Sequence, residues 1–234
     1  MRIYALKFLD IGEDELDNLC LLISLDKRDK IKHFRNKQDK IRTLIGEILL
    51  RTILIEQVGL ENKHLIFEQN QYGKPYLRNY STVNFNISHS GDFVVCATDV
   101  KPLGIDIEEV KDLEYVNIAQ NFFTESELSY IFKQSLDTQL SKFYELWTLK
   151  ESYVKCRGQG LATQLQSFSI EIDQAENIEV VINNKQVKEY SFKKFEIGLN
   201  YKMAICSVNR EIPHEVIMVE QESLIYHANS LIFE

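Results

Sequence analysis

The sequence predicts an α+β protein built from two similar halves. Each half holds one long helical stretch, within 39–59 in the first half and within 115–157 in the second. Short segments with alternating hydrophobicity, typical of strands, follow each stretch. The segment FVVCATD (93–99) also resembles KMAICSV (202–208), late in each half. We therefore expect two related α+β halves, residues 1–103 and 104–234, each a long helix packed on a mostly antiparallel sheet.

In the first half, strands are expected at 2–8, 64–69, 83–88 and 92–99, with QYGKPY (71–76) as the turn between the second and the third. Residues 13–24 have helical spacing, and Ser24 is the expected N-cap of the next helix. Gly59 ends the long helix. That helix carries an apolar stripe of Ile41, Leu44, Ile45, Ile48, Leu49 and Thr52.

The second half opens with GIDIE (104–108), which reads as a strand. A helical block follows from about 115 to 157, and Gly158 and Gly160 end it. Four further alternating segments predict antiparallel strands, at 167–172, 177–183, 189–197 and 201–208.

Composition places the chain among globular proteins of the cytoplasm. Of its 234 residues, 44% are hydrophobic and 26% are charged. No apolar run approaches the roughly 20 residues of a membrane helix, and the N-terminus lacks the features of a signal peptide. The four cysteines are far apart, so no CxxC motif exists, and buried thiols in a reducing compartment are expected. We expect no membrane association.

Charge is concentrated in one segment. The chain carries a net charge of −8, which argues against nucleic-acid binding. Residues 27–42 nevertheless hold eight Lys or Arg and two Asp. A basic patch on an acidic protein indicates a local anion site. The alternative is a solvated basic helix face.

Two acids alternate with two isoleucines in GIDIE. Residues two apart in a strand share one face and lie about 6.5–7 Å apart, so Asp106 and Glu108 face one way while Ile105 and Ile107 face the other. Such oxygen ligands could hold Mg²⁺ together with substrate oxygens. The alternative is an ordinary half-exposed strand.

Two further motifs could carry chemistry. In WTLKESYVK, Trp147, Glu151 and Lys155 share one helix face; the alternative is a surface ion pair worth about 0.3–0.5 kcal/mol, but the tryptophan argues for partial burial. In NISHSG, Ser88 and His89 end a strand and face opposite ways, so they cannot form a catalytic pair. That strand end could donate hydrogen bonds to phosphate, although a lone histidine is more often structural.

Five motifs in this order resemble the Sfp-type 4'-phosphopantetheinyl transferase family. They are KRDKIKHFRNKQDKIRTLIGEILLR, YGKPY, FNISHSGDFVVCA, GIDIE and FYELWTLKESYVKCRGQGL. The resemblance covers residues 1–210 and implies the transferase fold, with two α+β halves related by a pseudo-two-fold axis. It also implies Mg²⁺-dependent transfer of the 4'-phosphopantetheine arm of coenzyme A to a carrier-protein serine, with release of adenosine 3',5'-bisphosphate.

Carried over residue by residue, the resemblance implies that Asp106, Glu108 and Glu151 bind Mg²⁺, with Mn²⁺ as a substitute. Lys155 would lie beside the pyrophosphate, and Glu151 is the candidate base for the serine proton. The other residues implied to contact coenzyme A are Lys27, Lys30, Arg42, Thr43, Lys74, Pro75, Ser88 and His89.

The acceptor would be an acyl or peptidyl carrier protein that docks on residues 110–124. Phe122 and Phe123 are candidate apolar contacts, against the alternative that they belong to the core. The length fits a two-half, monomeric member, and the resemblance favours nonribosomal peptide or polyketide biosynthesis without naming the carrier. Two other functions stay open: a module that binds coenzyme A without turnover, and a Mg²⁺-dependent hydrolase of coenzyme A. Residues 211–234 match no motif.

Overall fold

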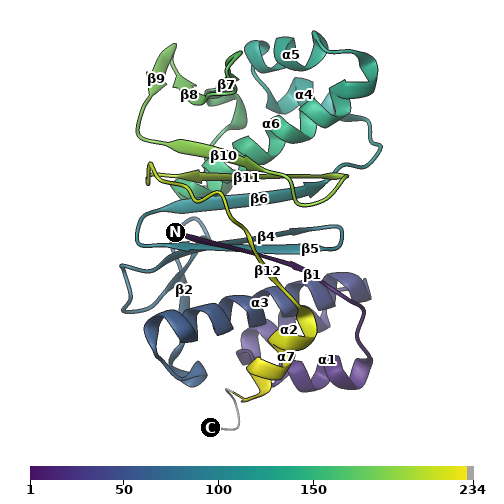
Figure 1. The fold of residues 1–234 in the computed structure, drawn as a ribbon, viewed down its shortest axis with the longest axis vertical. Helices are drawn as coiled ribbons and strands as arrows, with labels where there is room; N and C mark the ends of the chain where they lie inside the picture. Colours follow the sequence, from purple (N-terminus) through teal and green to yellow (C-terminus); the bar gives the residue numbers. More distant parts are fainter. Residues whose placement is uncertain (231–234) are drawn as a thin grey trace.

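The computed structural model describes residues 1–230 and shows four layers, with helices outside two facing sheets (Figure 1). The helices are α1 (Glu13–Cys20), α2 (Leu25–Lys32), α3 (Lys37–Val58), α4 (Tyr115–Phe122), α5 (Glu125–Phe132), α6 (Leu136–Arg157) and α7 (Gln221–Ser230), and a short 3-10 helix, η1, spans Asn62–His64. The strands are β1 (Arg2–Lys7), β2 (Phe67–Gln69), β3 (Pro75–Leu77), β4 (Asn84–Ser90), β5 (Phe93–Asp99), β6 (Leu103–Glu109), β7 (Ser169–Ile172), β8 (Ile178–Ile182), β9 (Lys185–Val187), β10 (Ser191–Phe195), β11 (Tyr201–Ser207) and β12 (Ile217–Val219).

The two central sheets enclose one apolar core. The first sheet has the order β12-β1-β5-β4, and the second has the order β10-β11-β6. Alternate residues of β1, β5, β6 and β11 point into the space between the sheets, as period-two alternation requires. Ile3, Val95, Ile105, Ile107 and Ile205 are all at most 1% exposed there. The isoleucines of GIDIE therefore anchor β6 in the core, and its acids face away from it.

The expected two-half α+β architecture is confirmed. Helix α3 packs on the outer face of the first sheet and α6 on that of the second (Figure 1). The Asn36 side chain accepts a hydrogen bond from the Gln38 amide and begins α3. Both helices contain 22 residues, and each ends at a left-handed glycine, Gly59 at φ +67° and Gly158 at φ +68°.

Several elements differ from the sequence-based expectation. The first helix ends at Cys20, where backbone bonds to Asn18 and Leu19 close a turn before the Ser24 N-cap. The block at 115–157 divides into three helices, and a Thr124–Glu127 capping box begins the middle one. The three-residue strands β3, β9 and β12 were not expected, because segments this short carry little periodicity. Helix α7, which has ten residues, was not expected either.

The end of the chain returns to the first half. Strand β12 pairs in parallel with β1, so it forms the outer edge of the first sheet. The Gln221 side chain accepts a hydrogen bond from the Leu9 amide and donates one to the Leu9 carbonyl. Helix α7 buries Leu224 and Ala228 in the α3 core. The division at residue 104 stays a prediction, and 217–230 lie with the first half. No helix in the described part of the chain could cross a membrane.

Candidate functional site

Alternation in β6 directs the acids of GIDIE toward helix α6, and Gly104 allows that helix to come close. Gly104 lies on the same face of β6 as Asp106 and Glu108. A Cβ atom built on Gly104 would lie 2.1 Å from the Ser152 carbonyl oxygen and 2.4 Å from the Cys156 amide nitrogen. The backbone of α6 therefore rests on this strand, and its side chains lie beside the two carboxylates.

Three short polar side chains of β4 join the edges of the two sheets. Asn86, Ser88 and Ser90 are two residues apart, so they point the same way. The Asn86 side-chain oxygen accepts a hydrogen bond from the Ile105 amide (2.8 Å), and Ser88 Oγ donates to Asp106 Oδ1 (2.8 Å). Ser90 Oγ donates to Glu108 Oε2 (2.7 Å). These contacts, here called the β4–β6 join, also orient both acids.

Lys155 is the cationic partner of Asp106. Its Nζ lies 2.5 Å from Asp106 Oδ1 and 2.9 Å from Ser88 Oγ. Lys155 comes from α6 and Ser88 from β4, so the group draws on both halves of the chain. Asp106 is buried, whereas Lys155 keeps part of its surface open to solvent. The ammonium group also donates to the Ile105 carbonyl (3.3 Å), so all three of its partners lie on β4 and β6.

The three predicted metal ligands influence one another electrostatically. Burial, and next the charge of Asp106, raise the pKa of Glu108 to about 7. Burial and Asp106 likewise raise the pKa of Glu151, and the Glu151 charge also acts on Glu108. A divalent cation bound near these carboxylates would relieve their repulsion.

The residues fit a cation, although the side chains are not already arranged around one. Asp106 Oδ2 is buried and has no hydrogen-bond partner among residues 1–230, so this oxygen is available to bind a cation. In the same residues, no group of three or more His, Cys, Asp or Glu side chains is arranged to hold a metal ion. Lys155 occupies the other oxygen of Asp106.

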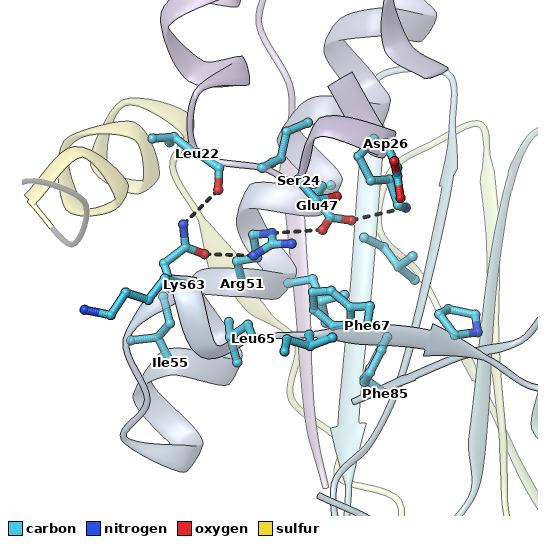
Figure 2. Close-up of a pocket in the computed structure, with 18 of the residues that line it drawn as sticks. Leu22, Ser24, Asp26, Glu47, Arg51, Ile55, Lys63, Leu65, Phe67 and Phe85 are labelled. Atoms are coloured by element: carbon cyan, nitrogen blue, oxygen red, sulfur yellow. Dashed lines mark hydrogen bonds and ion pairs between the residues drawn. The ribbon is translucent and has the colours of Figure 1, made fainter. Parts of the chain in front are cut away.

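A cavity of about 1380 Å³ lies in the first half of the molecule (Figure 2). Its walls come from α2, α3, η1 and the strands β2 and β4. Five of the residues implied to contact coenzyme A line it, namely Lys27, Lys30, Thr43, Pro75 and His89. Partial desolvation and the nearby Arg42 lower the pKa of His89, although the ring stays open to solvent.

Arg42 and Lys74 make contacts beside this cavity. Arg42 donates to the Gly91 carbonyl (2.7 Å) and to Asp39 (2.8 Å). The Lys74 ammonium donates to the carbonyls of Leu103 (3.0 Å) and Lys155 (2.7 Å). Lys74 thus ties the start of β6 to the end of α6, and burial lowers its pKa.

Two buried ion pairs were not foreseen from the sequence. Glu47 pairs with Arg51 in α3 at 2.9 Å, in the wall of the cavity. Lys150 bonds both oxygens of Glu127 at 2.8 Å, and neither side chain is exposed. The Glu47–Arg51 spacing of four residues was visible, but it matches an ordinary surface pair. The Lys150–Glu127 contact joins separate helices, so no local pattern could have revealed it.

The two candidate docking phenylalanines have different environments. Phe123 is 2% exposed and packs against Phe143 and Trp147, so the expectation that it contacts a docked protein is wrong. It belongs to the core because it follows the last residue of α4 and its ring packs against α6. Phe122 is 42% exposed and meets the Trp147 ring edge-on.

Comparison with known proteins covers almost the whole chain. A family model described as the 4'-phosphopantetheinyl transferase superfamily matches residues 102–206, and one described as 4'-phosphopantetheinyl transferase, N-terminal, matches residues 12–101. The 4'-phosphopantetheinyl transferase Sfp of Bacillus subtilis (strain 168) is 36% identical over 227 residues, covering 96% of this chain and all of that one.

A second relative is the 4'-phosphopantetheinyl transferase gsp of Aneurinibacillus migulanus, 37% identical across 80% of this chain and 76% of that one. Among solved structures, a holo-(acyl-carrier-protein) synthase from Bacillus anthracis in complex with CoA is 16% identical. It covers 45% of this chain and 93% of that chain with a TM-score of 0.38.

We predict that Gly104→Ala destabilises the protein, because the new Cβ would collide with the backbone of α6. Urea unfolding should show a loss of about 1–3 kcal/mol or more in the free energy of unfolding. Gly12→Ala is the matched control, since nothing lies within 4 Å of its added Cβ, and it should stay within about 1 kcal/mol. Equal losses in the two variants would contradict this account of β6 and α6.

We also predict a pH dependence that Glu108 causes. Its folded-state pKa of about 7 exceeds the ordinary 4.5, so the folded state holds a proton that the unfolded state has lost. The contribution of this group to the free energy of unfolding is therefore complete below pH 4.5 and is lost as the pH rises through about 7. Without divalent cations, Glu108→Gln should lose less unfolding free energy than the wild type between about pH 5 and about pH 8. Glu109→Gln is the control, and a slope in Glu108→Gln equal to that of the wild type would contradict the assignment.

Proposed function

The chain belongs to the 4'-phosphopantetheinyl transferase family, and we infer that it is an enzyme that transfers the 4'-phosphopantetheine arm of coenzyme A to a carrier protein. The observation that carries this inference within the structure is the group of Asp106, Glu108 and Lys155, held by the β4–β6 join at the seam between the halves. The cavity in the first half has room for a nucleotide, and Lys27 and Lys30 in its lining could meet an anion.

The reaction would form a bond between the carrier serine oxygen and the β-phosphorus of coenzyme A. The bond from that phosphorus to the bridging oxygen breaks, and adenosine 3',5'-bisphosphate leaves. The serine proton passes to a base, for which we propose Glu151, because burial and the charge of Asp106 raise its pKa. Catalysis of this kind rests mainly on positioning and on neutralising the phosphate oxygens.

We propose that Asp106, Glu108 and Glu151 hold Mg²⁺, with Mn²⁺ as a substitute. When bound, the ion neutralises charge on the phosphate oxygens. The free Asp106 Oδ2 and the mutual repulsion of the carboxylates support this assignment. Lys155 would pair with a pyrophosphate oxygen.

We propose that the cavity binds the nucleotide end of coenzyme A, which carries about four negative charges near neutral pH. Lys27 and Lys30 on α2 would contact the 3'-phosphate. Thr43 and His89 line the same cavity, and Pro75 would lie beside the nucleotide. Arg42 precedes Thr43 on α3 and would contribute its positive charge to binding of the nucleotide. Lys74 would act by holding the end of α6, which carries Lys155.

The carrier would dock on residues 110–124, and Phe122 is the candidate contact. Its ring is exposed and touches Trp147, which lies one turn before Glu151 on α6. We propose an acyl or peptidyl carrier, of fatty-acid, polyketide or nonribosomal-peptide synthesis.

We propose that the protein is a monomer, because one chain supplies both sides of the seam. The four buried thiols fit the cytoplasm. The mass in solution tests the monomer.

Metal-dependent transfer provides the direct test of the function. Glu151→Gln and Glu108→Gln should each reduce labelling of an apo carrier by fluorescent coenzyme A by about 100-fold or more. EDTA should abolish wild-type labelling, and added Mg²⁺ should restore it. Glu109→Gln removes the same charge beside the site and should label normally. Binding without transfer to any carrier would point to a binding module, and release of free phosphopantetheine without carrier to a hydrolase.

For docking, Phe122→Ala should raise the KM for the carrier by about tenfold while leaving the KM for coenzyme A unchanged, because it removes an exposed aromatic contact. Phe132→Ala is the matched control, since Phe132 is similarly exposed at 39% but ends α5, outside 110–124. If both variants behave alike, the proposed docking surface is wrong.

A further inference from the structure

Four acidic residues, Asp26, Glu47, Glu61 and Glu68, line the cavity that is proposed to bind an anion, and only Glu47 among them is buried. Glu47 is 6% exposed and lines the same space as Lys27, Lys30 and Thr43. Thr43, Glu47 and Arg51 are four residues apart on α3, so they form one stripe that lines the cavity. A carboxylate there opposes a phosphate, so its presence needs a physical reason.

Glu47 is held firmly from one side. Arg51 Nε donates to Glu47 Oε1 at 2.9 Å, and the same guanidinium donates to Asn62 Oδ1 at 2.9 Å (Figure 2). Asn62 in turn donates to the Leu22 carbonyl. The Arg51 guanidinium also lies over the ring of Phe67, 5.0 Å from its centroid. The carboxylate therefore cannot turn away from the cavity without losing this network.

Glu47 contacts Lys27 more loosely. Lys27 Nζ lies 3.2 Å from Glu47 Oε2, and the Lys27 side chain is 43% exposed, against 8% for Arg51. Arg51 is thus the permanent partner of Glu47, and Lys27 is the partner that can exchange. An incoming phosphate would compete with Glu47 for the Lys27 ammonium group.

We propose that Glu47 is an internal competitor that limits how tightly the enzyme holds the 3'-phosphate of coenzyme A and of the product, adenosine 3',5'-bisphosphate. This inference rests on the proposed function of the cavity. Glu47 pairs with Lys27 whenever the phosphate is absent, so each departure of the nucleotide is partly compensated by a new ion pair. The carboxylate lowers affinity for substrate and product alike and favours product release.

The test measures binding of adenosine 3',5'-bisphosphate by calorimetry. Glu47→Gln should bind it about three- to tenfold more tightly than the wild type, because the carboxylate charge is lost while the amide oxygen can still accept from Arg51. Dephospho-coenzyme A, which lacks the 3'-phosphate, should bind both proteins alike. Glu56→Gln, which removes an exposed acid of the same helix outside the cavity, should leave affinity unchanged.

A double mutant tests whether Lys27 carries the effect. With Lys27→Met already present, Glu47→Gln should change the affinity for the bisphosphate by less than about twofold. Weaker or unchanged binding in Glu47→Gln, or equal tightening toward dephospho-coenzyme A, would overturn the proposal. Thermal unfolding checks each variant. Should Glu47→Gln fail to fold, Glu47→Asp serves, because its shorter side chain withdraws from Lys27 and should shift affinity in the same direction.

The two inferences fail in different ways. A wild-type protein that transfers no phosphopantetheine and binds no bisphosphate would refute the proposed function, and the competitor role with it. A wild-type protein that does both, with no tightening in Glu47→Gln, would refute only the role of Glu47.

Discussion

The structure depends on a contact in which side chains take the place of backbone hydrogen bonds. Strands β4 and β6 are the edges of two separate sheets, and Asn86, Ser88 and Ser90 connect them. In a continuous sheet, backbone groups would make these hydrogen bonds, whereas here the side chains of β4 bond to the backbone and the acids of β6. Because Ser88 and Ser90 bond to Asp106 and Glu108, the contact that fixes the two halves also orients the charged groups between them.

The helix behind the acids adds the third component. Gly104 allows α6 to approach the strand, and Lys74 ties the end of that helix to β6 from the other half. Lys155 is thereby held against Asp106, and Glu151 lies where the Asp106 charge reaches it. A small residue and a buried lysine, neither facing the anion cavity, thus place two groups proposed for catalysis.

The sequence was informative where a local pattern decides the structure. Alternation in GIDIE predicted which residues of β6 enter the core, and helical spacing predicted α3, a helical block that ends where α6 ends, and both terminal glycines. It failed where the partner is distant in sequence. Nothing in the local sequence reveals the long-range contacts of Ser90 or Glu127, since their partners lie on other elements. Phe122 and Phe123 are adjacent, so no periodicity could separate the exposed ring from the buried one.

The parallel pairing of β12 with β1 has a consequence for how the protein is made. Strand β1 is synthesised before the other strands of the first sheet, but its outer edge stays unpaired until residues 217–219 have been synthesised. An open strand edge can pair with another chain, so the nascent first half is exposed to association until these residues emerge. Residues 217–219 therefore act as a closing step, and the first sheet is complete only after the second half has been synthesised.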